Sequence, residues 1–145
     1  MVILSVDYGD ARTGLAVCDK LEMLASPVGV IFEKYEPKVL EQVRLAAEKA
    51  KAQLIVVGLP RNMDGTFGER AEKCAAFAAK LGELTGIQTA TWDERLTTVS
   101  AHRALNEVNV RGKKRKEIVD AVSAVMILED FLKSREPLNK SQHTL

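Results

Sequence analysis

The sequence is poor in the features that mark several classes of protein. Two cysteines, Cys18 and Cys74, are too few in 145 residues for a disulfide scaffold, and we expect both to be reduced and packed. The longest apolar runs, at residues 2–6 and 54–57, are far too short to cross a bilayer. No charged and then apolar leader precedes the first of these runs. We therefore expect a cytoplasmic protein with no membrane partner.

The chain also lacks a large excess of charge of either sign, since its formal net charge is +1. A chain so balanced does not as a whole attract polyanions, so any nucleic-acid binding must depend on local clustering. One basic cluster exists around Gly112 and comprises Arg111, Lys113, Lys114, Arg115 and Lys116. This run fits either a track for a phosphate backbone or the solvated start of a helix.

The overall composition is that of a single globular domain. Apolar residues make up 46% of the chain and charged residues 28%, which is too apolar for disorder. A length of 145 residues suffices for one well-buried core but not for two catalytic domains. We expect one domain over residues 1–136 and a flexible C-terminal tail over residues 137–145.

Three apolar segments follow one another in the first third of the chain, at residues 2–6, 14–18 and 24–32. Each reads as a strand, and the turn residues from Gly9 to Thr13 suit a hairpin between the first two. Pro27 interrupts the third segment and favours an edge position or a kink. Consecutive strands of this kind form an antiparallel meander.

Helical and strand patterns alternate in the rest of the chain. Apolar residues recur at helical spacing over residues 37–52 and 69–84, each followed by a short strand, at 54–58 and 87–92. Two further helices are expected at residues 97–105 and 116–132. Strand-helix-strand units require parallel crossovers. The predicted fold is therefore α/β, with a mixed five-stranded sheet flanked by helices, in which a three-strand antiparallel meander joins the parallel strands.

Three carboxylates occupy places that are locally unfavourable for charge. Asp7 ends a strand expected to be central, Glu94 follows the strand that ends at Trp92, and Asp120 lies in an apolar helix. Converging, partly buried carboxylates repel one another unless a cation lies between them, and oxygen-only ligands favour Mg²⁺ or Mn²⁺. Two such ions about 3.5–4 Å apart suit phosphodiester hydrolysis. Asp7 and Glu94 would meet at the carboxyl ends of their strands if those strands are parallel neighbours.

Each acid also has a simpler interpretation. Asp7 fits a turn former before Tyr8 and Gly9, Glu94 a surface partner of Arg95, and Asp120 a solvated helix position. Asp93 competes with Glu94, because adjacent residues of an extended chain face opposite ways. Only one of these two acids can readily enter the site.

Four motifs, in order along the chain, resemble those of one known family. They are Asp-Tyr-Gly at 7–9 with Gly-Leu-Ala-Val at 14–17, Val-Gly-Leu-Pro at 57–60 with Asn-Met-Asp-Gly-Thr at 62–66, Asp-Glu-Arg-Leu-Thr-Thr at 93–98, and Asp-Ala at 120–121 leading to Ile-Leu at 127–128. Together they resemble the YqgF family of small bacterial ribonuclease-H-like proteins. Its members are described as Holliday junction resolvases and as nucleases that mature the 5′ end of pre-16S rRNA.

The resemblance implies a metal-dependent endonuclease whose catalytic, metal-binding acids are Asp7, Glu94 and Asp120. Its implied partner is nucleic acid, either structured RNA such as an rRNA precursor or branched DNA. The chain departs from the family where many relatives carry Thr-Lys and this sequence has Asp10-Ala11, and where a common Leu is Arg61. Asp10 adds a negative charge beside the proposed metal site.

Candidate contacts to the substrate come from charge and hydrogen-bonding capacity as well as from the resemblance. Three arginines suit contacts with phosphates: Arg12, Arg61 and Arg95. Two loop residues, Asn62 and Thr66, suit hydrogen-bond donation to the substrate, and the basic run with Lys113, Lys114 and Arg115 suits contact along its backbone. Trp92 and Phe67 are candidates for base stacking, with core packing favoured for Trp92.

Two other functions fit parts of the sequence. The segment from Asp7 to Gly14 also looks like the first phosphate loop of sugar kinases and actin-type ATPases, although those proteins close two such domains around the nucleotide. A nonenzymatic RNA-binding module would depend on the basic run instead of the acids. The sequence leaves a monomer and a homodimer open, and a resolvase that cuts two strands is expected to dimerise.

Overall fold

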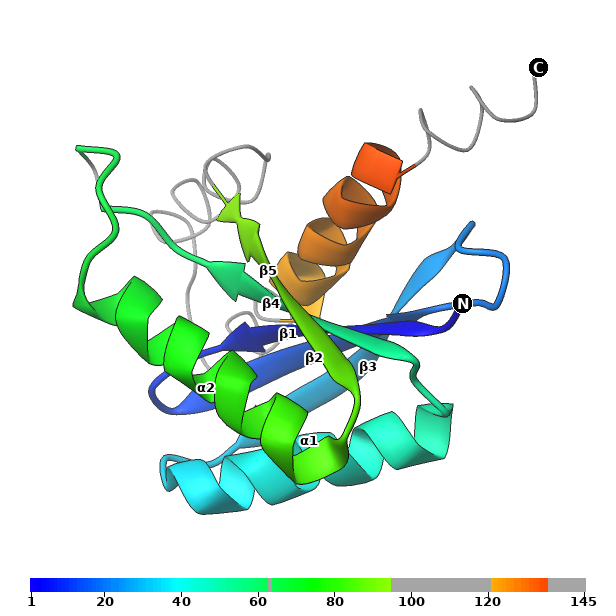
Figure 1. Ribbon diagram of the computed structural model, residues 1–145, viewed down its shortest axis with the longest axis horizontal. Helices are drawn as coiled ribbons and strands as arrows, with labels where there is room; N and C mark the ends of the chain where they lie inside the picture. The colour runs from blue at the N-terminus through cyan, green and yellow to red at the C-terminus, as the bar shows by residue number, and fades with distance from the viewer. Residues whose placement is uncertain (63, 95–120, 136–145) are drawn as a thin grey trace.

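The computed structural model describes residues 1–62, 64–94 and 121–135 of the chain. Five strands form one sheet in the order β3-β2-β1-β4-β5 (Figure 1). The strands are β1 (Ile3–Tyr8), β2 (Arg12–Cys18), β3 (Ala25–Phe32), β4 (Leu54–Leu59) and β5 (Gln88–Asp93). β1 pairs antiparallel with β2 and parallel with β4, while β4 pairs parallel with β5. The predicted fold class, a mixed five-stranded sheet with an antiparallel meander, is confirmed.

β3 lies at one edge of the sheet and carries an irregularity near Pro27. Leu15 of β2 faces Gly29, whereas the next residue, Ala16, faces Pro27, so Val28 is the extra residue of a bulge. Proline has no N–H to donate, and an edge strand with a bulge tolerates that loss. Both parts of the prediction for Pro27, edge position and local distortion, are confirmed.

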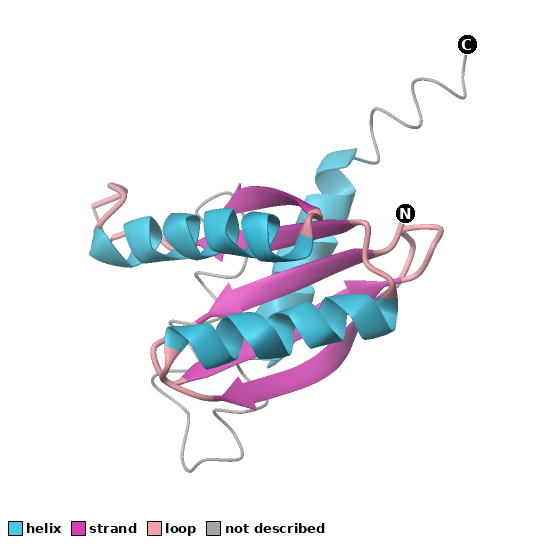
Figure 2. Cartoon of the chain, turned by 60° about the horizontal axis from the view of Figure 1, so that its bottom comes forward, coloured by secondary structure: helices cyan, strands magenta, loops and turns pink. Residues whose placement is uncertain are grey.

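Two helices, α1 (Glu36–Ala50) and α2 (Glu69–Thr85), cover one face of the sheet (Figure 2). Pro37 lies in the first turn of α1, where its missing N–H costs nothing. α2 ends at Gly86, whose φ of 71° is the left-handed conformation that closes many helices. The helical residues 121–135 lie on the opposite face (Figures 1 and 2). The sheet is thus covered on both faces.

The strands bury side chains in alternation into two apolar clusters. Under α1 and α2 lie residues such as Leu4, Val6, Leu15, Ile55, Val57, Phe77 and Leu81. Under the helix at 121–135 lie residues such as Ile3, Ala16, Val56, Ala124, Ile127 and Leu128. Burial on both faces explains why the strands read as continuous apolar runs in the sequence.

Several expectations concern segments outside the described residues. These are the helix at 97–105, the first residues of the helix at 116–132, and the tail at 137–145. Within the described part, Cys18 and Cys74 are both buried and are not joined by a disulfide, as expected. None of the helices in that part is long and apolar enough to cross a membrane.

Candidate active site

The candidate site lies where β1 approaches its carboxyl end. Asp7 is half-buried near the end of β1 and pairs with Gly14 of β2. β1 continues one residue beyond it, to Tyr8. Residues two apart share a face of a strand, so Asp7 lies on the same face as Ser5. Ser5 Oγ donates to the carbonyl oxygen of Ala124 over 2.6 Å. Asp7 therefore belongs to the face that residues 121–135 cover.

Glu94 follows β5 and is only 2% exposed. A Cβ built on Gly58 of β4 would lie 2.8 Å from Glu94 Oε1 and 2.7 Å from Ile127 Cδ1. Any side chain at Gly58 would therefore displace the Glu94 carboxylate or the end of the Ile127 side chain. Val57 pairs with Val6, so the next residue along β4, Gly58, lies beside Asp7 of β1. A residue without a side chain thus lies between the two acids.

This arrangement corrects one expectation about the strands. Asp7 and Glu94 were expected to meet on condition that their strands are parallel neighbours, but β4 lies between β1 and β5. The two acids lie on either side of Gly58 of β4, which has no side chain to separate them. Gly58 could not be recognised as this gap without the tertiary structure, because its role depends on which side chains approach it.

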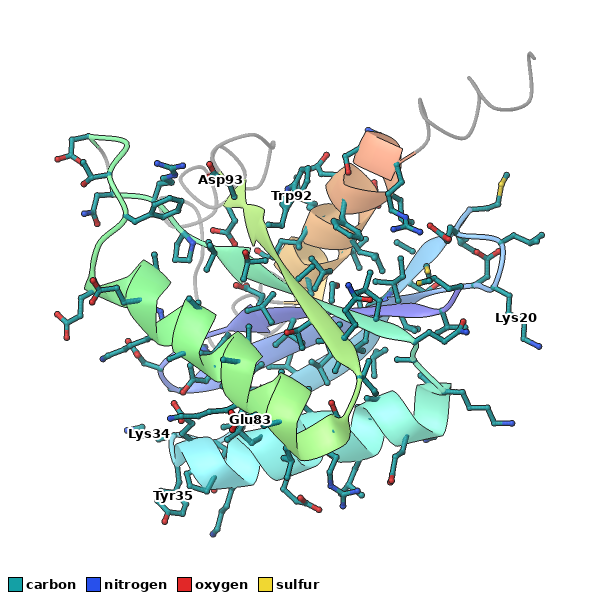
Figure 3. The ribbon with its side chains drawn as sticks, viewed as in Figure 1. Lys20, Lys34, Tyr35, Glu83, Trp92 and Asp93 are labelled. Carbon is teal, nitrogen blue, oxygen red and sulfur yellow. The ribbon has the colours of Figure 1, made fainter. Side chains whose placement is uncertain are left out.

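Asp93 and Glu94 face opposite ways, as expected for neighbours at the end of a strand. Asp93 accepts from Arg61 Nε over 3.1 Å and from Arg61 Nη2 over 2.5 Å. Trp92 packs on the other side against Phe131, with ring centroids 5.8 Å apart (Figure 3). Glu94 shares the Trp92 side, beside Ile127. Of the two acids, Glu94 is the one that lies on the Asp7 face.

Arg61 anchors the loop that follows β4. Besides its two bonds to Asp93, it donates to the carbonyl oxygen of Gly65 over 2.6 Å. Its guanidinium carbon also lies 3.5 Å from the ring centroid of Phe67, and its side chain is only 17% exposed. The predicted phosphate contact of Arg61 stays a prediction, but the structure gives this charge several partners within the protein.

Asn62 and Thr66 lie exposed on the same loop. Asn62 Nδ2 donates to Thr66 Oγ1 over 3.2 Å, and the Thr66 hydroxyl donates to Asp64 Oδ1 over 2.6 Å. The Thr66 hydroxyl and the Thr66 backbone N–H both donate to Asp64, and these two hydrogen bonds hold the pKa of the Asp64 carboxyl below its ordinary value. The loop is thus ordered by its own polar groups, and donation from Asn62 or Thr66 to a substrate stays a prediction.

Arg12 begins β2 and is half-buried. It lies two residues before Gly14, the partner of Asp7, and so belongs to the Asp7 face of the sheet. The other predicted site residues lie outside the described residues: Asp120, Arg95, Lys113, Lys114 and Arg115. Within the described residues, no group of three His, Cys, Asp or Glu side chains is close enough to hold a metal ion.

Comparison with known proteins identifies the family. The family model described as "RuvX: Holliday junction resolvase" matches residues 1–134. The chain belongs to the RuvX family. It is 42% identical to a "Putative pre-16S rRNA nuclease" of Halothermothrix orenii over 139 residues, 96% of this chain and 99% of that protein. A protein of the same name from Clostridium botulinum strain Hall is also 42% identical, over 92% of this chain and 98% of its own.

Solved structures agree with the fold of this RuvX-family chain. RuvC of T. thermophilus in complex with a Holliday junction substrate has a TM-score of 0.57 at 14% identity, covering 94% of this chain and 96% of RuvC. The fowlpox virus Holliday junction resolvase has a TM-score of 0.53 at 11% identity, covering 92% of this chain and 99% of its own. The fold is ribonuclease-H-like, and the chain is a nuclease, an enzyme that hydrolyses nucleic acids.

One residue near the site of this RuvX-family chain was not selected from the sequence. Arg70, in the first turn of α2, donates to Asp10 Oδ1 over 2.6 Å and to the carbonyl oxygen of Tyr8. Its guanidinium carbon lies 5.1 Å from the centroid of the Tyr8 ring. Arg70 is separated from Asp10 by 60 residues and begins an Ala-rich helix, so no local pattern distinguishes it.

Tyr8 fixes the end of β1 on the other face of the sheet. Its ring stacks on Phe77 with centroids 3.9 Å apart and planes 11° apart. Its hydroxyl donates to Glu36 Oε2 over 3.1 Å. Burial, together with the Glu36 charge, raises the pKa of Tyr8 to about 12. The residue next to Asp7 is therefore held by both α1 and α2.

Proposed function

We propose that this chain is a metal-dependent endonuclease in which Asp7, Glu94 and Asp120 hold Mg²⁺ or Mn²⁺. The observation that supports the proposal is the gap at Gly58, which has Asp7 of β1 on one side and Glu94, directly after β5, on the other. Asp120 is included because it directly precedes the helical residues 121–135, which cover that face. The donor set consists of carboxylate oxygens alone, which is what these hard cations prefer.

The residues present fit such an ion. A carboxylate that is 2% exposed is costly unless it has a compensating partner, and a second carboxylate nearby increases that cost. A side chain at Gly58 would fill the space beside the Glu94 carboxylate. Glycine keeps that space open, and a cation between the acids would offset their repulsion.

A pair of bound ions would supply an activated water and stabilise the leaving oxygen during displacement at phosphorus. The protein's own residues contribute positioning. The Glu94 carboxylate and the Ile127 side chain both lie against Gly58, and the Ser5 bond to Ala124 joins the helix to β1.

We propose the precursor of 16S rRNA, cut at its 5′ end, as the substrate. The support is the name of the relatives that share 42% identity over nearly their whole length. A four-way DNA junction is the second candidate, supported by the description of the family model. The junction would require two active sites, and hence a homodimer, whereas an RNA end can be processed by a monomer.

A cleavage panel tests the proposal. The substrates are precursor 16S rRNA, duplex RNA and a four-way DNA junction, each with Mg²⁺, Mn²⁺ or EDTA. We expect Asp7→Asn, Glu94→Gln and Asp120→Asn to lower the cleavage rate by more than about 100-fold, because each removes a ligand of the ion that stabilises the transition state. Glu83→Gln, on an exposed position of α2, is the matched control and should cut like the parent.

Metal binding provides a readout separate from activity. Calorimetric titration with Mn²⁺ should give a heat of binding for the parent that is lost in the three acid variants and retained in Glu83→Gln. Thermal melting should show that all variants are folded. If Glu94→Gln binds Mn²⁺ and cuts as the parent does, the assignment of the metal site is wrong.

A further inference from the structure

We propose that Arg70 is a phosphate-binding residue of the substrate path and that Asp10 occupies it in the free protein as an internal competitor. The inference rests on the proposed function for its ligand, a nucleic-acid backbone phosphate. Neither residue belongs to the proposed metal site. Their contacts supply three arguments.

The first argument is that Arg70 is held in place without Asp10. One terminal nitrogen donates to the carbonyl oxygen of Tyr8, and the guanidinium lies over the Tyr8 ring. The other terminal nitrogen donates to a single oxygen of Asp10. A guanidinium has five donors, so these contacts leave donors for another acceptor. Removing the Asp10 carboxylate would therefore leave an oriented cation rather than a mobile one.

The second argument is a contrast with Arg61. Arg61 and Asp93 are 17% and 18% exposed and share two hydrogen bonds, whereas Arg70 and Asp10 are 31% and 80% exposed and share one. Exposed ion pairs contribute little to stability, because water solvates both partners well. A phosphate, which can accept two parallel bonds from arginine, can replace the Asp10 carboxylate at small cost. The half-buried Arg61 pair, with two hydrogen bonds and less exposure, would lose more in such an exchange.

The third argument is position. Tyr8, which holds Arg70, directly follows Asp7 on β1, and Asp10 lies in the turn to β2. The cation therefore lies at the same end of β1 as the proposed metal site. A nucleic-acid strand with one phosphate at Asp7 has further phosphates within reach of this end. Asp10 then weakens binding twice, by occupying Arg70 and by repelling the strand.

A double-mutant cycle in a binding assay tests this assignment. Asp10→Asn, Arg70→Gln and the double variant are titrated with a labelled RNA duplex and a four-way DNA junction in EDTA, at several salt concentrations. Arg70→Gln should weaken binding about threefold and flatten the dependence of log K on log salt by about 0.7–0.9, as expected for one lost phosphate contact. Asp10→Asn should tighten binding by a similar factor and steepen that dependence.

The decisive comparison is Asp10→Asn in the two backgrounds. Competition for Arg70 predicts that Asp10→Asn tightens binding only while Arg70 is present. An equal gain in the Arg70→Gln background would show that Asp10 acts through general repulsion, and would overturn the proposal. A purely structural role for the pair predicts weaker binding for both single variants, which would overturn it as well.

Three controls complete the design. Asp19→Asn makes the same charge change in the β2–β3 turn and should leave binding unchanged, and Arg70→Lys keeps the charge and should retain much of the affinity. Repeating the cycle in the Asp7→Asn background separates the two proposals. If the parent protein fails to cut but its binding affinity responds to Asp10→Asn, only the proposed function is contradicted. If the parent protein cuts but its binding affinity does not respond to Arg70→Gln, only this inference is contradicted.

Discussion

The two faces of the sheet differ in what they bury. The face under α1 and α2 has a core built around apolar side chains such as Val43, Phe77 and Leu81. The same face also buries the hydroxyl side chain of Thr13. The opposite face has a smaller apolar cluster, and the polar side chains of Ser5, Glu94 and Ser123 are buried on it or in its helix. Among the described residues, Glu94 is the only buried charged side chain, so one face contributes mostly stability while the other also holds a charge. Successive side chains of a strand point to opposite faces, so one strand can contribute to both of these environments.

The largest expected effect comes from matched truncations on the two faces. Leu81→Ala and Ile127→Ala each remove a fully buried aliphatic side chain, and each should lower the free energy of unfolding by about 2–5 kcal/mol. Only Ile127→Ala should also slow cleavage, because Ile127 packs beside the Glu94 carboxylate. Urea unfolding gives the stability, and single-turnover cleavage at low temperature gives the activity while both variants are folded.

This pair tests the division between the faces directly. Leu81 lies near the C-terminal end of α2 and belongs to the apolar cluster on the face opposite Asp7 and Glu94. Equal losses of activity in the two variants, measured on fully folded protein, would mean that the apolar face supports catalysis as much as the polar face does.

Gly58→Ala is expected to have the next largest effect. The added Cβ would meet Glu94 Oε1 at 2.8 Å and Ile127 Cδ1 at 2.7 Å, so one of them must move. We expect a loss of about 1–3 kcal/mol in stability, as for other overpacked sites, and a drop in cleavage of about 10–100-fold from the displaced carboxylate.

Gly82→Ala is the matched control for Gly58→Ala. Its Cβ would lie 3.4 Å from Thr89 Oγ1, close to an ordinary contact, and alanine is the better helix former by about 0.5–1 kcal/mol. The control should therefore keep or raise the melting temperature and cut normally. Full activity in Gly58→Ala would show that the gap beside Glu94 is not needed.

Ser5→Ala probes the hydrogen bond between the sheet and the helix of the polar face. The variant removes a buried donor to the Ala124 carbonyl, and we expect a cost of about 1 kcal/mol, since one hydrogen bond is lost. Ser134→Ala removes a bond of the same length, 2.6 Å to the Phe131 carbonyl, at an exposed site and should be nearly neutral. Thermal melting of the two variants compares them. Equal melting temperatures would mean that the Ser5 bond contributes nothing measurable.

The same contrast between faces explains how far the sequence could lead. Continuous apolar runs predicted the five strands, and apolar residues at helical spacing predicted α1 and α2, because these signals are local. Asp7 and Glu94 were selected because charge is unfavourable where they lie. Gly58 and Arg70 were not selected, because a glycine's importance depends on what approaches it and an arginine's partner can lie 60 residues away. Sheet order, which places β4 between the two acids, is also a property of the tertiary fold.

The smallest expected effect concerns Tyr8, whose hydroxyl is bonded to Glu36 under the apolar face. The pKa of Tyr8 is raised from its ordinary 10.0 to about 12, by burial and by the Glu36 charge. The stabilising contribution of the neutral Tyr8 hydroxyl is complete below pH 10.0 and is lost as the pH rises through about 12, because the folded state resists ionisation.

Glu36→Gln removes the repelling charge, so the pKa of Tyr8 should fall. The variant should cost about 0.5 kcal/mol or less in stability, since the contacts of Glu36 with Lys80 and Tyr8 are partly solvated. Tyrosinate absorbance reports the titration, with exposed Tyr35 as the internal reference. An unchanged titration would mean that burial alone sets the pKa of Tyr8, and that α1 does not influence the strand end next to Asp7.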